Sequence, residues 1–174
     1  MITVRPALVS DLSAVEPIYA HYVRNSLATF ETTPPDAVWW LARFDAITSA
    51  GWPFLVAVEG DEVLGYAYVA QYRPRPAYAR TVENSIYVEP GAAGRGVGTA
   101  LLSALLASAA EAGAREVIAV VATEDTAASQ ALHARAGFVE AGRLRGVGFK
   151  LGRWSDTLLL QLSLPRGRQP APPH

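Results

Sequence analysis

The stretch from residue 85 to residue 106 constrains the fold of this chain more than any other. It begins as an apolar strand, passes through a turn with glycines at positions 94, 96 and 98, and continues as a helix. The helix is predicted from apolar side chains at helical spacing, namely Val97, Leu101, Leu102, Leu105 and Leu106. The chain is therefore expected to join a strand directly to a helix through a glycine-rich turn.

The glycine turn itself predicts a site for a phosphate-bearing ligand. Gly94, Gly96 and Gly98 have no side chains to keep a ligand away, and their backbone can adopt positive φ. Backbone N–H groups then converge at a helix N-terminus, where the helix dipole adds positive potential, and Arg95 places a fixed charge beside them. The alternative is a turn whose glycines serve only tight strand–helix packing. The glycines alone do not decide between the two.

Length and composition favour one domain and exclude several kinds of site. The 174 residues suffice for a hydrophobic core, and half of them are hydrophobic. The net charge of −1 gives no electrostatic basis for binding nucleic acid or a membrane surface. The absence of cysteine excludes disulfides, thiolate metal sites and a cysteine nucleophile. The first residues lack the apolar core of a signal peptide, and no apolar run could span a bilayer, so the expected location is the cytoplasm.

Apolar periodicity and turn signals predict elements in the order β-α-α-β-β-β-α-β-α-β-β. A break or kink is expected at Pro17, and strand 116–123 is interpreted as buried on both faces. The expected fold class is α/β, with parallel and antiparallel neighbours in one sheet, as a single domain over 1–164 before a disordered tail over 165–174. The other expected strands are 2–5, 54–59, 63–71, 81–89, 138–150 and 154–164, and the helices begin near Asp11, near Asp36, at Val97 and at Ala127.

Two titratable residues are candidates for proton transfer. Glu83 lies on the strand that leads into the glycine turn, and partial burial would raise its pKa toward the range useful for a general base. The alternative is a solvent-facing or salt-bridged glutamate. His133 could act as an acid or base near neutral pH, but such a histidine more often makes a local hydrogen bond. A lone histidine without ligand partners makes no metal site.

The loop 72–80 is broken by prolines and rich in arginine and tyrosine. Its Arg73 and Arg75 lie near Tyr72 and Tyr78, which suits a carboxylate-bearing small molecule, although an ordinary solvated loop explains the pattern as well. A second basic group is interpreted as a solvated hairpin face and comprises Arg143, Arg145, Lys150 and Arg153. The four tryptophans, interpreted as core and interface residues, are Trp39, Trp40, Trp52 and Trp154.

Four stretches together resemble the GNAT N-acetyltransferase superfamily, and within it the phosphinothricin N-acetyltransferase family with the related methionine sulfone and sulfoximine acetyltransferases. They are TVENSIYV at 81–88, GRGVG at 94–98, LHARAGF at 132–138 and VGFKLGRWSD at 147–156. The glycine turn alone identifies only the superfamily, whereas the last two stretches and Glu83 point to the narrower family. The resemblance extends from Ile2 to about Leu164. It implies a GNAT-like central mixed sheet whose middle strands splay apart to admit acetyl-CoA.

The resemblance also implies which residues bind acetyl-CoA. The pyrophosphate would lie on the loop 94–99, and the pantetheine arm would pair with the backbone of residues 86–88. Ala93 and Thr126 stand where the family usually has Gln or Arg and Asn, respectively, and both differences remove polar contacts to the cofactor. No metal is implied. The implied cofactor-binding residues are Ile86, Tyr87, Val88, Gly94, Arg95, Gly96, Val97, Gly98, Thr99, Thr126 and Ser129.

The same resemblance implies catalytic and substrate-binding residues. Glu83 would take the proton from the substrate amine, the backbone N–H of Val88 would stabilise the oxyanion, and His133 would protonate the departing thiolate or order water. Direct transfer in a ternary complex is expected, because no cysteine is available as an acyl carrier. Arg75 is assigned to the α-carboxylate of a small amino-acid-like substrate. A homodimer that buries apolar residues of the last strands is also implied. The implied substrate-binding residues are Arg73, Arg75, Tyr78, Glu83, Asn84 and Ser85.

Three other functions are compatible with parts of the sequence. An acetyltransferase for a peptide N-terminus or a polyamine would share the fold and cofactor, but a peptide lacks the free α-carboxylate that the arginine loop suits. An NAD-dependent oxidoreductase could use the three glycines, with Glu124 at a strand end for the ribose, although the third glycine is not at the required spacing and there is no second nucleotide-binding half. A catalytically idle acyl-CoA sensor would bind acetyl-CoA without turnover, and Glu83 argues against it.

Overall fold

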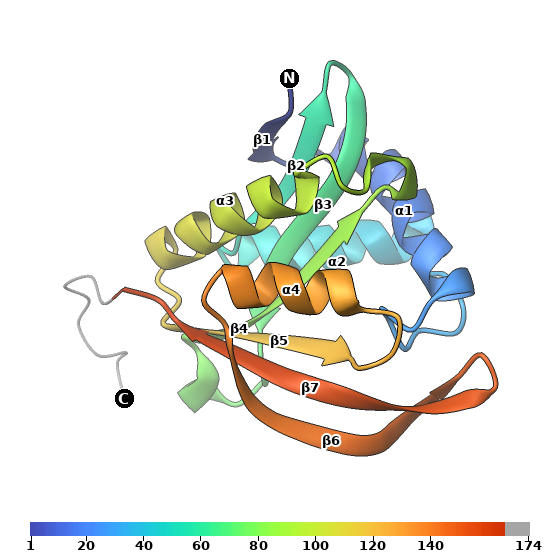
Figure 1. Ribbon diagram of the computed structural model, residues 1–174. Helices are drawn as coiled ribbons and strands as arrows, with labels where there is room; N and C mark the ends of the chain where they lie inside the picture. The colour runs from blue at the N-terminus through green and yellow to red at the C-terminus, as the bar shows by residue number, and fades with distance from the viewer. Residues whose placement is uncertain (166–174) are drawn as a thin grey trace.

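The computed structural model describes residues 1–165, which form one mixed sheet covered by helices on both faces (Figure 1). The sheet has seven strands in the order β1-β2-β3-β4-β5-β7-β6. The strands are β1 (Thr3–Pro6), β2 (Phe54–Glu59), β3 (Glu62–Gln71), β4 (Thr81–Val88), β5 (Glu116–Ala122), β6 (Val139–Lys150) and β7 (Arg153–Ser163). The helices are α1 (Leu12–Asn25), α2 (Ala37–Ser49), α3 (Val97–Glu111) and α4 (Ala127–Arg135), with short 3₁₀ turns at Val9–Asp11, Pro76–Tyr78 and Pro90–Ala92.

This order of strands and α-helices confirms the order predicted from the sequence. The expected disordered tail over 165–174 lies, apart from Pro165, outside the described residues. Among residues 1–165, no helix combines the length and apolar character needed to cross a membrane.

The middle of the sheet opens between β4 and β5. These two strands are parallel neighbours, and only three residue pairs lie in register: Thr81 with Glu116, Val82 with Val117, and Glu83 with Ile118. Both strands continue beyond this point, β4 to Val88 and β5 to Ala122, without pairing to each other. The central strands therefore splay apart, as the resemblance implied, and the backbone of β4 beyond Glu83 has no partner strand on that side.

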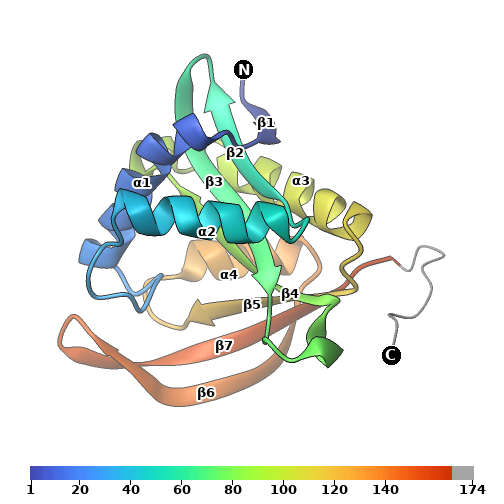
Figure 2. The same ribbon diagram turned by 180° about the vertical axis from the view of Figure 1, so that it is seen from behind.

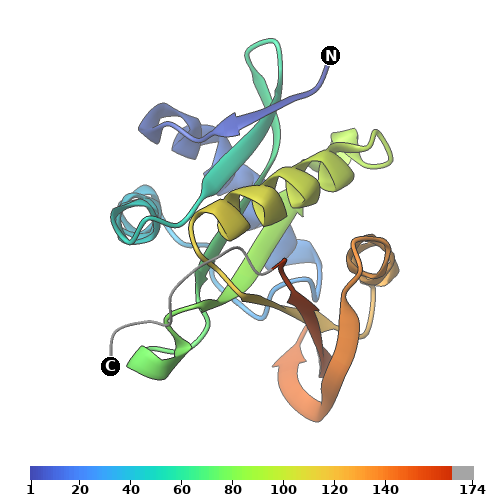
Figure 3. The same cartoon turned by 90° about the vertical axis from the view of Figure 1, so that its left-hand side faces the viewer.

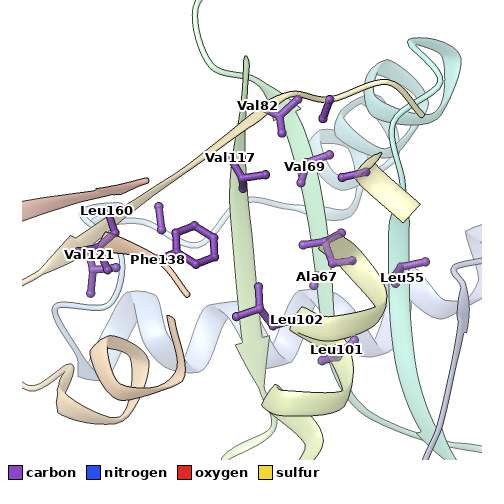
Figure 4. Close-up of a cluster of buried hydrophobic side chains, with 14 of the residues drawn as sticks. Leu55, Ala67, Val69, Val82, Leu101, Leu102, Val117, Val121, Phe138 and Leu160 are labelled. Carbon is purple, nitrogen blue, oxygen red and sulfur yellow. The ribbon is translucent and has the colours of Figure 1, made fainter. Parts of the chain in front are cut away.

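Helices α3 and α4 lie on one face of the sheet (Figure 1). Leu101, Leu102 and Leu105 of α3 are almost fully buried, and they pack with the sheet residues that share their hydrophobic cluster. Figure 4 shows Leu101 and Leu102 of α3 directed toward Ala67, Val69 and the neighbouring strands. Because α3 follows the glycine turn directly, this packing fixes the helix N-terminus relative to the end of β4.

Helices α1 and α2 cover the opposite face, as the reverse view shows (Figure 2). The side view in Figure 3 places α2 and α4 on opposite sides of the sheet. Asp36 begins α2 by accepting a hydrogen bond from the backbone N–H of Trp39, at 2.9 Å. Trp40 is 1 % exposed and packs edge-on against Tyr66 of β3, so the second hydrophobic cluster is strongly aromatic.

Of the break or kink expected at Pro17, the break is wrong, because α1 runs from Leu12 to Asn25 as one helix. A proline inside a helix removes one backbone hydrogen bond and costs roughly 3 kcal/mol. Val15 and Ile18 of α1 are buried in the hydrophobic cluster that also holds residues of α2, β2 and β3. We infer that burial of this apolar face outweighs the missing bond, which a local sequence pattern cannot show.

Strand β5 is not buried on both faces, contrary to the sequence interpretation. Val117, Ala119 and Val121 are buried in the cluster under α3, whereas Val120 is 40 % exposed. The physical reason is the placement of α1 and α2, whose cluster includes residues of β2, β3 and β4 but none of β5. Strand β5 is apolar on both sides, but in a single chain the helices cover only one of them.

Lys150 does not belong to a solvated hairpin face. It is 5 % exposed, and its Nζ donates hydrogen bonds to the backbone carbonyl oxygens of Thr29, at 2.6 Å, and Tyr22, at 3.4 Å. Burial lowers the pKa of Lys150, and the charge of Glu31 opposes that effect. The end of the β6–β7 hairpin is therefore fastened to the segment between α1 and α2. The exposed members of the basic group are Arg143, Arg145 and Arg153.

The tryptophans differ in their surroundings. Trp40 is a core residue and Trp52 is partly buried against both hydrophobic clusters, as expected. Trp39 is 41 % exposed and Trp154, near the tip of the β6–β7 hairpin, is 67 % exposed. The core interpretation therefore holds fully for Trp40 and in part for Trp52. Trp39 and Trp154 are exposed and are available for an interface.

Candidate active site

Strand β4 presents different side chains to the two faces of the sheet. Tyr87 packs against Tyr19 of α1, with ring centroids 5.0 Å apart, on the face covered by α1 and α2. Glu83 and Ser85 share this face by strand alternation. Asn84 points the other way, because its side chain contacts His133 of α4. The strand can therefore place a carboxylate on one face while its other face lies against the helices that follow the glycine turn.

The glycine turn has the backbone conformation that an anion site requires. Gly94 and Gly96 have φ values of +77° and +83°, a region that favours glycine, and Gly96 is the N-cap of α3. No side chain caps this helix, so the first N–H groups of a 15-residue helix are left for a ligand. Gly98 serves packing instead, because a Cβ there would lie 3.3 Å from the Leu132 side chain. Gly98 therefore fits the packing interpretation, whereas Gly94 and Gly96 have a conformation compatible with the predicted anion site.

Arg95 lies in the glycine turn and forms an ion pair with Glu59 at the end of β2. The N-terminal amino group of Met1 contacts the same carboxylate at 3.0 Å. Hydrogen bonds from the N-terminus and from Arg95 lower the pKa of Glu59. Because Arg95 and Glu59 are both well exposed, solvent screens the pair, and Arg95 can exchange it for a phosphate at little cost.

Glu83 is partly buried, and burial raises the pKa of its carboxyl group. The positive charges of Arg73 and Arg43 act in the opposite direction and hold the pKa down. Arg73 lies over the ring of Tyr72, 4.7 Å from its centroid, at the start of the β3–β4 loop. A half-buried carboxylate between two guanidinium groups is suited to accept a proton from a ligand that these cations attract.

Arg43 was not among the residues singled out from the sequence. It lies on α2, and its guanidinium sits 5.2 Å from the ring centroid of Tyr68 on β3. Arg43 and Glu83 are far apart in the sequence, and only the packing of α2 on the sheet brings them near each other in space. No sequence motif marks an arginine within a helix. The sequence therefore offered no signal for it.

The remaining residues of the loop 72–80 lie further out. The side chain of Arg75 is exposed, and the backbone carbonyl of Arg75 accepts a hydrogen bond from Gln71 Nε2 at 3.2 Å. Tyr78 is 39 % exposed and meets Tyr72 edge-on, with ring centroids 6.0 Å apart. Arg73, Arg75 and Tyr78 are all exposed, and of these three only Arg73 acts on the charge of Glu83.

His133 is 2 % exposed, and both of its ring nitrogens have neighbours. Nδ1 lies 2.8 Å from the carbonyl oxygen of Ser129, which can only accept, so Nδ1 carries the proton. Nε2 is then an acceptor, and it receives a hydrogen bond from Asn84 Nδ2 at 3.0 Å. Burial lowers the pKa of His133 and favours this neutral form. The pair links β4 to α4 across the opening between β4 and β5.

Thr126, at the start of α4, turns its hydroxyl inward. Its Oγ1 contacts the carbonyl oxygen of Ala122 and accepts a hydrogen bond from Gln130 Nε2 at 3.1 Å. Thr126 is 5 % exposed, and Ser129 is partly buried beside His133. Thr99, in contrast, is exposed on the first turn of α3. Among the described residues, no group of three or more His, Cys, Asp or Glu is arranged to hold a metal ion.

A splayed β4–β5 pair, followed by a glycine turn and a helix without a side-chain cap, is the arrangement that the resemblance to the GNAT superfamily implied. The chain belongs to the acetyltransferase (GNAT) family, whose model matches residues 15–138. This membership overturns the oxidoreductase alternative and makes acetyl-CoA the acyl donor. The residues present fit that donor, because the unpaired backbone of β4 and the free N–H groups of α3 lie in succession along the chain.

More particular relatives are found among amino-acid acetyltransferases. The chain is 48 % identical over 165 residues to the phosphinothricin N-acetyltransferase of Alcaligenes faecalis, covering 95 % of this chain and 84 % of the relative. It is 40 % identical over 163 residues to the L-methionine sulfoximine/L-methionine sulfone acetyltransferase of Pseudomonas paraeruginosa, covering 93 % and 94 %.

Solved structures agree with these relatives. The phosphinothricin acetyltransferase of Sinorhizobium meliloti in complex with acetyl-CoA superposes with a TM-score of 0.93 at 41 % identity, covering 99 % of this chain and 93 % of that one. A putative acetyltransferase from Salmonella typhimurium with acetyl-CoA gives a TM-score of 0.92 at 35 % identity, covering 98 % of both chains. The GNAT fold expected from the sequence is confirmed.

Replacing Gly96 with alanine tests the anion site. Alanine at φ +83° is strained by about 1–2 kcal/mol, and relaxation of that strain would turn the N–H groups of α3 away from the pyrophosphate. We expect the Kd for acetyl-CoA, measured by calorimetry, to rise about tenfold. Gly51→Ala is the matched control, because Gly51 has φ +80° and equally open surroundings far from the turn. Equal acetyl-CoA affinities in the two variants would contradict the assignment.

Proposed function

We propose that this enzyme acetylates the α-amino group of a small amino acid of the phosphinothricin, methionine sulfoximine or methionine sulfone type. The observation that carries the proposal is the position of Glu83, a half-buried carboxylate on β4 at the point where β4 and β5 part, with the charge of Arg73 close to it. The named substrates of the relatives support the same class, since each has a free α-amino group and an α-carboxylate.

In the proposed reaction Glu83 is the general base. A primary amine is protonated near neutral pH and cannot attack, so Glu83 accepts that proton directly or through one water molecule. Bound acetyl-CoA supplies a thioester carbonyl as the electrophile. The backbone N–H of Val88 stabilises the negative charge that develops on the carbonyl oxygen as the new C–N bond forms. The C–S bond then breaks, and the released thiolate takes up a proton.

The acyl donor is proposed to lie along β4 and over the glycine turn. The backbone of residues 86–88 is unpaired on the β5 side and can bind the pantetheine arm in the manner of an added strand. Val88 is held in place by its neighbours, since its carbonyl oxygen accepts a hydrogen bond from the Tyr22 hydroxyl at 2.6 Å. The residues proposed to hold the rest of the donor are Gly94, Arg95, Gly96, Val97, Gly98, Thr99, Thr126 and Ser129.

The resemblance implied Arg75 for the α-carboxylate of the substrate; we propose Arg73 in its place, with Arg75 at the outer edge of the same loop. Both side chains are exposed, but only Arg73 is among the charges that shift the pKa of Glu83. A carboxylate at Arg73 would leave the α-amino group next to Glu83. Ser85 follows on the same face of β4, and Tyr78 closes the solvent side of the loop.

His133 is proposed to orient Asn84 and so to order the site. With Nδ1 bonded to the Ser129 carbonyl and Nε2 bonded to Asn84, the imidazole has no proton to spare for a departing thiolate. Its lowered pKa points the same way. The thiolate of coenzyme A is a good leaving group, and we assign its proton to solvent.

We also propose that the enzyme acts as a homodimer in the cytoplasm. The requirement for acetyl-CoA favours that compartment. The β6–β7 hairpin carries large apolar side chains that a single chain leaves exposed, and burying them against a second copy would remove them from water. These side chains are Leu144, Val147, Phe149, Leu151 and Trp154.

Glu83→Gln keeps the size of the side chain and removes the base. We expect kcat to fall about 10²–10⁴-fold, the range of general-base catalysis, with the Kd for acetyl-CoA nearly unchanged. Glu62→Gln, on the exposed start of β3, is the control and should retain full activity. A kcat for Glu83→Gln within twofold of the parent would remove Glu83 from the mechanism.

The pH dependence of kcat/KM reports the same carboxyl group. Only the ionised form of Glu83 accepts a proton, so kcat/KM falls as the pH drops through the pKa of this group. Because burial raises that pKa, the acidic limb of the pH profile lies at a higher pH than an ordinary glutamate would give. Removing a nearby cation raises the pKa further. We expect Arg73→Met to move the limb to higher pH and Arg75→Met to leave it in place, because Arg75 does not act on Glu83. A limb that Arg73→Met leaves unmoved contradicts the arrangement.

A thiol-release assay with acetyl-CoA tests the substrate class. The panel contains phosphinothricin, methionine sulfoximine, methionine sulfone, the common amino acids, polyamines and a short peptide. We expect turnover with the first three. Turnover confined to the peptide or the polyamines would leave the fold and cofactor intact and overturn the substrate assignment. Binding of acetyl-CoA without any turnover would favour a sensor.

A further inference from the structure

Arg43 is a second arginine on the Glu83 face of the sheet, contributed by a different element from Arg73. It comes from α2, whereas Arg73 comes from the loop after β3. Tyr68, which carries the Arg43 guanidinium over its ring, lies in register with Ser85, and the next position of β3 on that face lies in register with Glu83. The two arginines therefore approach the same stretch of β4 from the helix side and from the loop side.

The hydrogen-bonding capacity of Arg43 is unused. Its Nε is buried and has no hydrogen-bond partner, and none of the ion pairs among residues 1–165 involves it. A ring contact occupies only one face of a guanidinium and leaves the N–H groups in its plane free to bind an anion. A polar atom that is buried usually has a hydrogen-bond partner, and the Nε of the half-buried Arg43 has none.

The charges on this face exceed what Glu83 alone needs. Two guanidinium cations act on the one carboxylate of Glu83, so the cations that act there outnumber it by one. An amino acid with an apolar side chain brings one carboxylate, which one arginine satisfies. A substrate with a second anionic group, at the far end of its side chain, would match the remaining cation.

We propose that Arg43 binds an anionic group on the substrate side chain, so that the preferred acceptors are amino acids with a phosphinate or carboxylate at the end of that chain. The inference rests on the proposed function, in which Arg73 takes the α-carboxylate and Glu83 the amine proton. Arg43 is thus a specificity-determining residue. It discriminates between a charged side-chain end and a neutral one of similar shape.

Two substrates separate the role of charge from that of shape. Phosphinothricin ends in a phosphinate anion, and methionine sulfone ends in an uncharged sulfone with two oxygens. Arg43→Gln removes the charge, and Arg24→Gln is the control on the exposed side of α1. We expect Arg43→Gln to raise KM for phosphinothricin about tenfold or more, the effect of one charge-assisted hydrogen bond, and KM for the sulfone less than threefold. Arg24→Gln should change neither.

Structural damage would have a different signature. If Arg43 only supports Tyr68, Arg43→Gln will affect the two substrates equally and will lower Tm, which overturns the proposal. No change with either substrate overturns it as well. A salt titration adds an independent readout, because KM for phosphinothricin in the parent should rise more steeply with ionic strength than KM for the sulfone.

Failure of the proposed function can be told apart from failure of the Arg43 inference. If the parent enzyme turns over neither substrate, the proposed function fails, and binding of phosphinothricin to the complex with coenzyme A is then measured by calorimetry. Binding that Arg43→Gln weakens about tenfold supports the anion site without the reaction. Binding that is absent in the parent, or equal in the two proteins, overturns it.

Discussion

The site depends on the place where β4 and β5 stop pairing. Three register pairs hold the two parallel strands together, and the last of them involves Glu83. From the next residue onward, the backbone of β4 has no partner strand on that side, which is the condition for binding an extended ligand arm. Glu83, the unpaired backbone and the glycine turn then follow one another between residues 83 and 98 of the chain. Any change that extended the pairing by two residues would close the opening and bury the site.

The two faces of β4 carry separate tasks. The face toward α1 and α2 holds the carboxylate, two arginines and a group of tyrosines, and it suits a polar acceptor substrate. The face toward α3 and α4 holds Asn84 and His133, whose hydrogen bond ties the strand to the helix across the opening. This division explains why adjacent residues Glu83 and Asn84 differ so much in their surroundings. It also lets the binding of substrate and acyl donor be altered by different substitutions.

The sequence was informative wherever neighbours along the chain determine the structure. Residues 54–59 were predicted as a strand with the same bounds that the structure gives, and the glycine turn led directly to the start of α3. The failures were long-range. Lys150 is buried because a segment 121 residues away supplies its acceptor, and Arg43 meets Glu83 only through the packing of α2 on the sheet. The partners of a buried charge cannot be read from its local pattern.

The strand order has a consequence for how the chain is made. Within residues 1–165, β7 is synthesised after the other strands, yet it lies between β5 and β6 rather than at the edge of the sheet. On the ribosome, β5 exposes an unpaired apolar edge until residues 153–163 have emerged, and β6 has nothing to pair with. A chain terminated before that point would be prone to aggregate and would not be a smaller active enzyme. The completed sheet, and with it the anchoring of the hairpin through Lys150, comes only with the final strand.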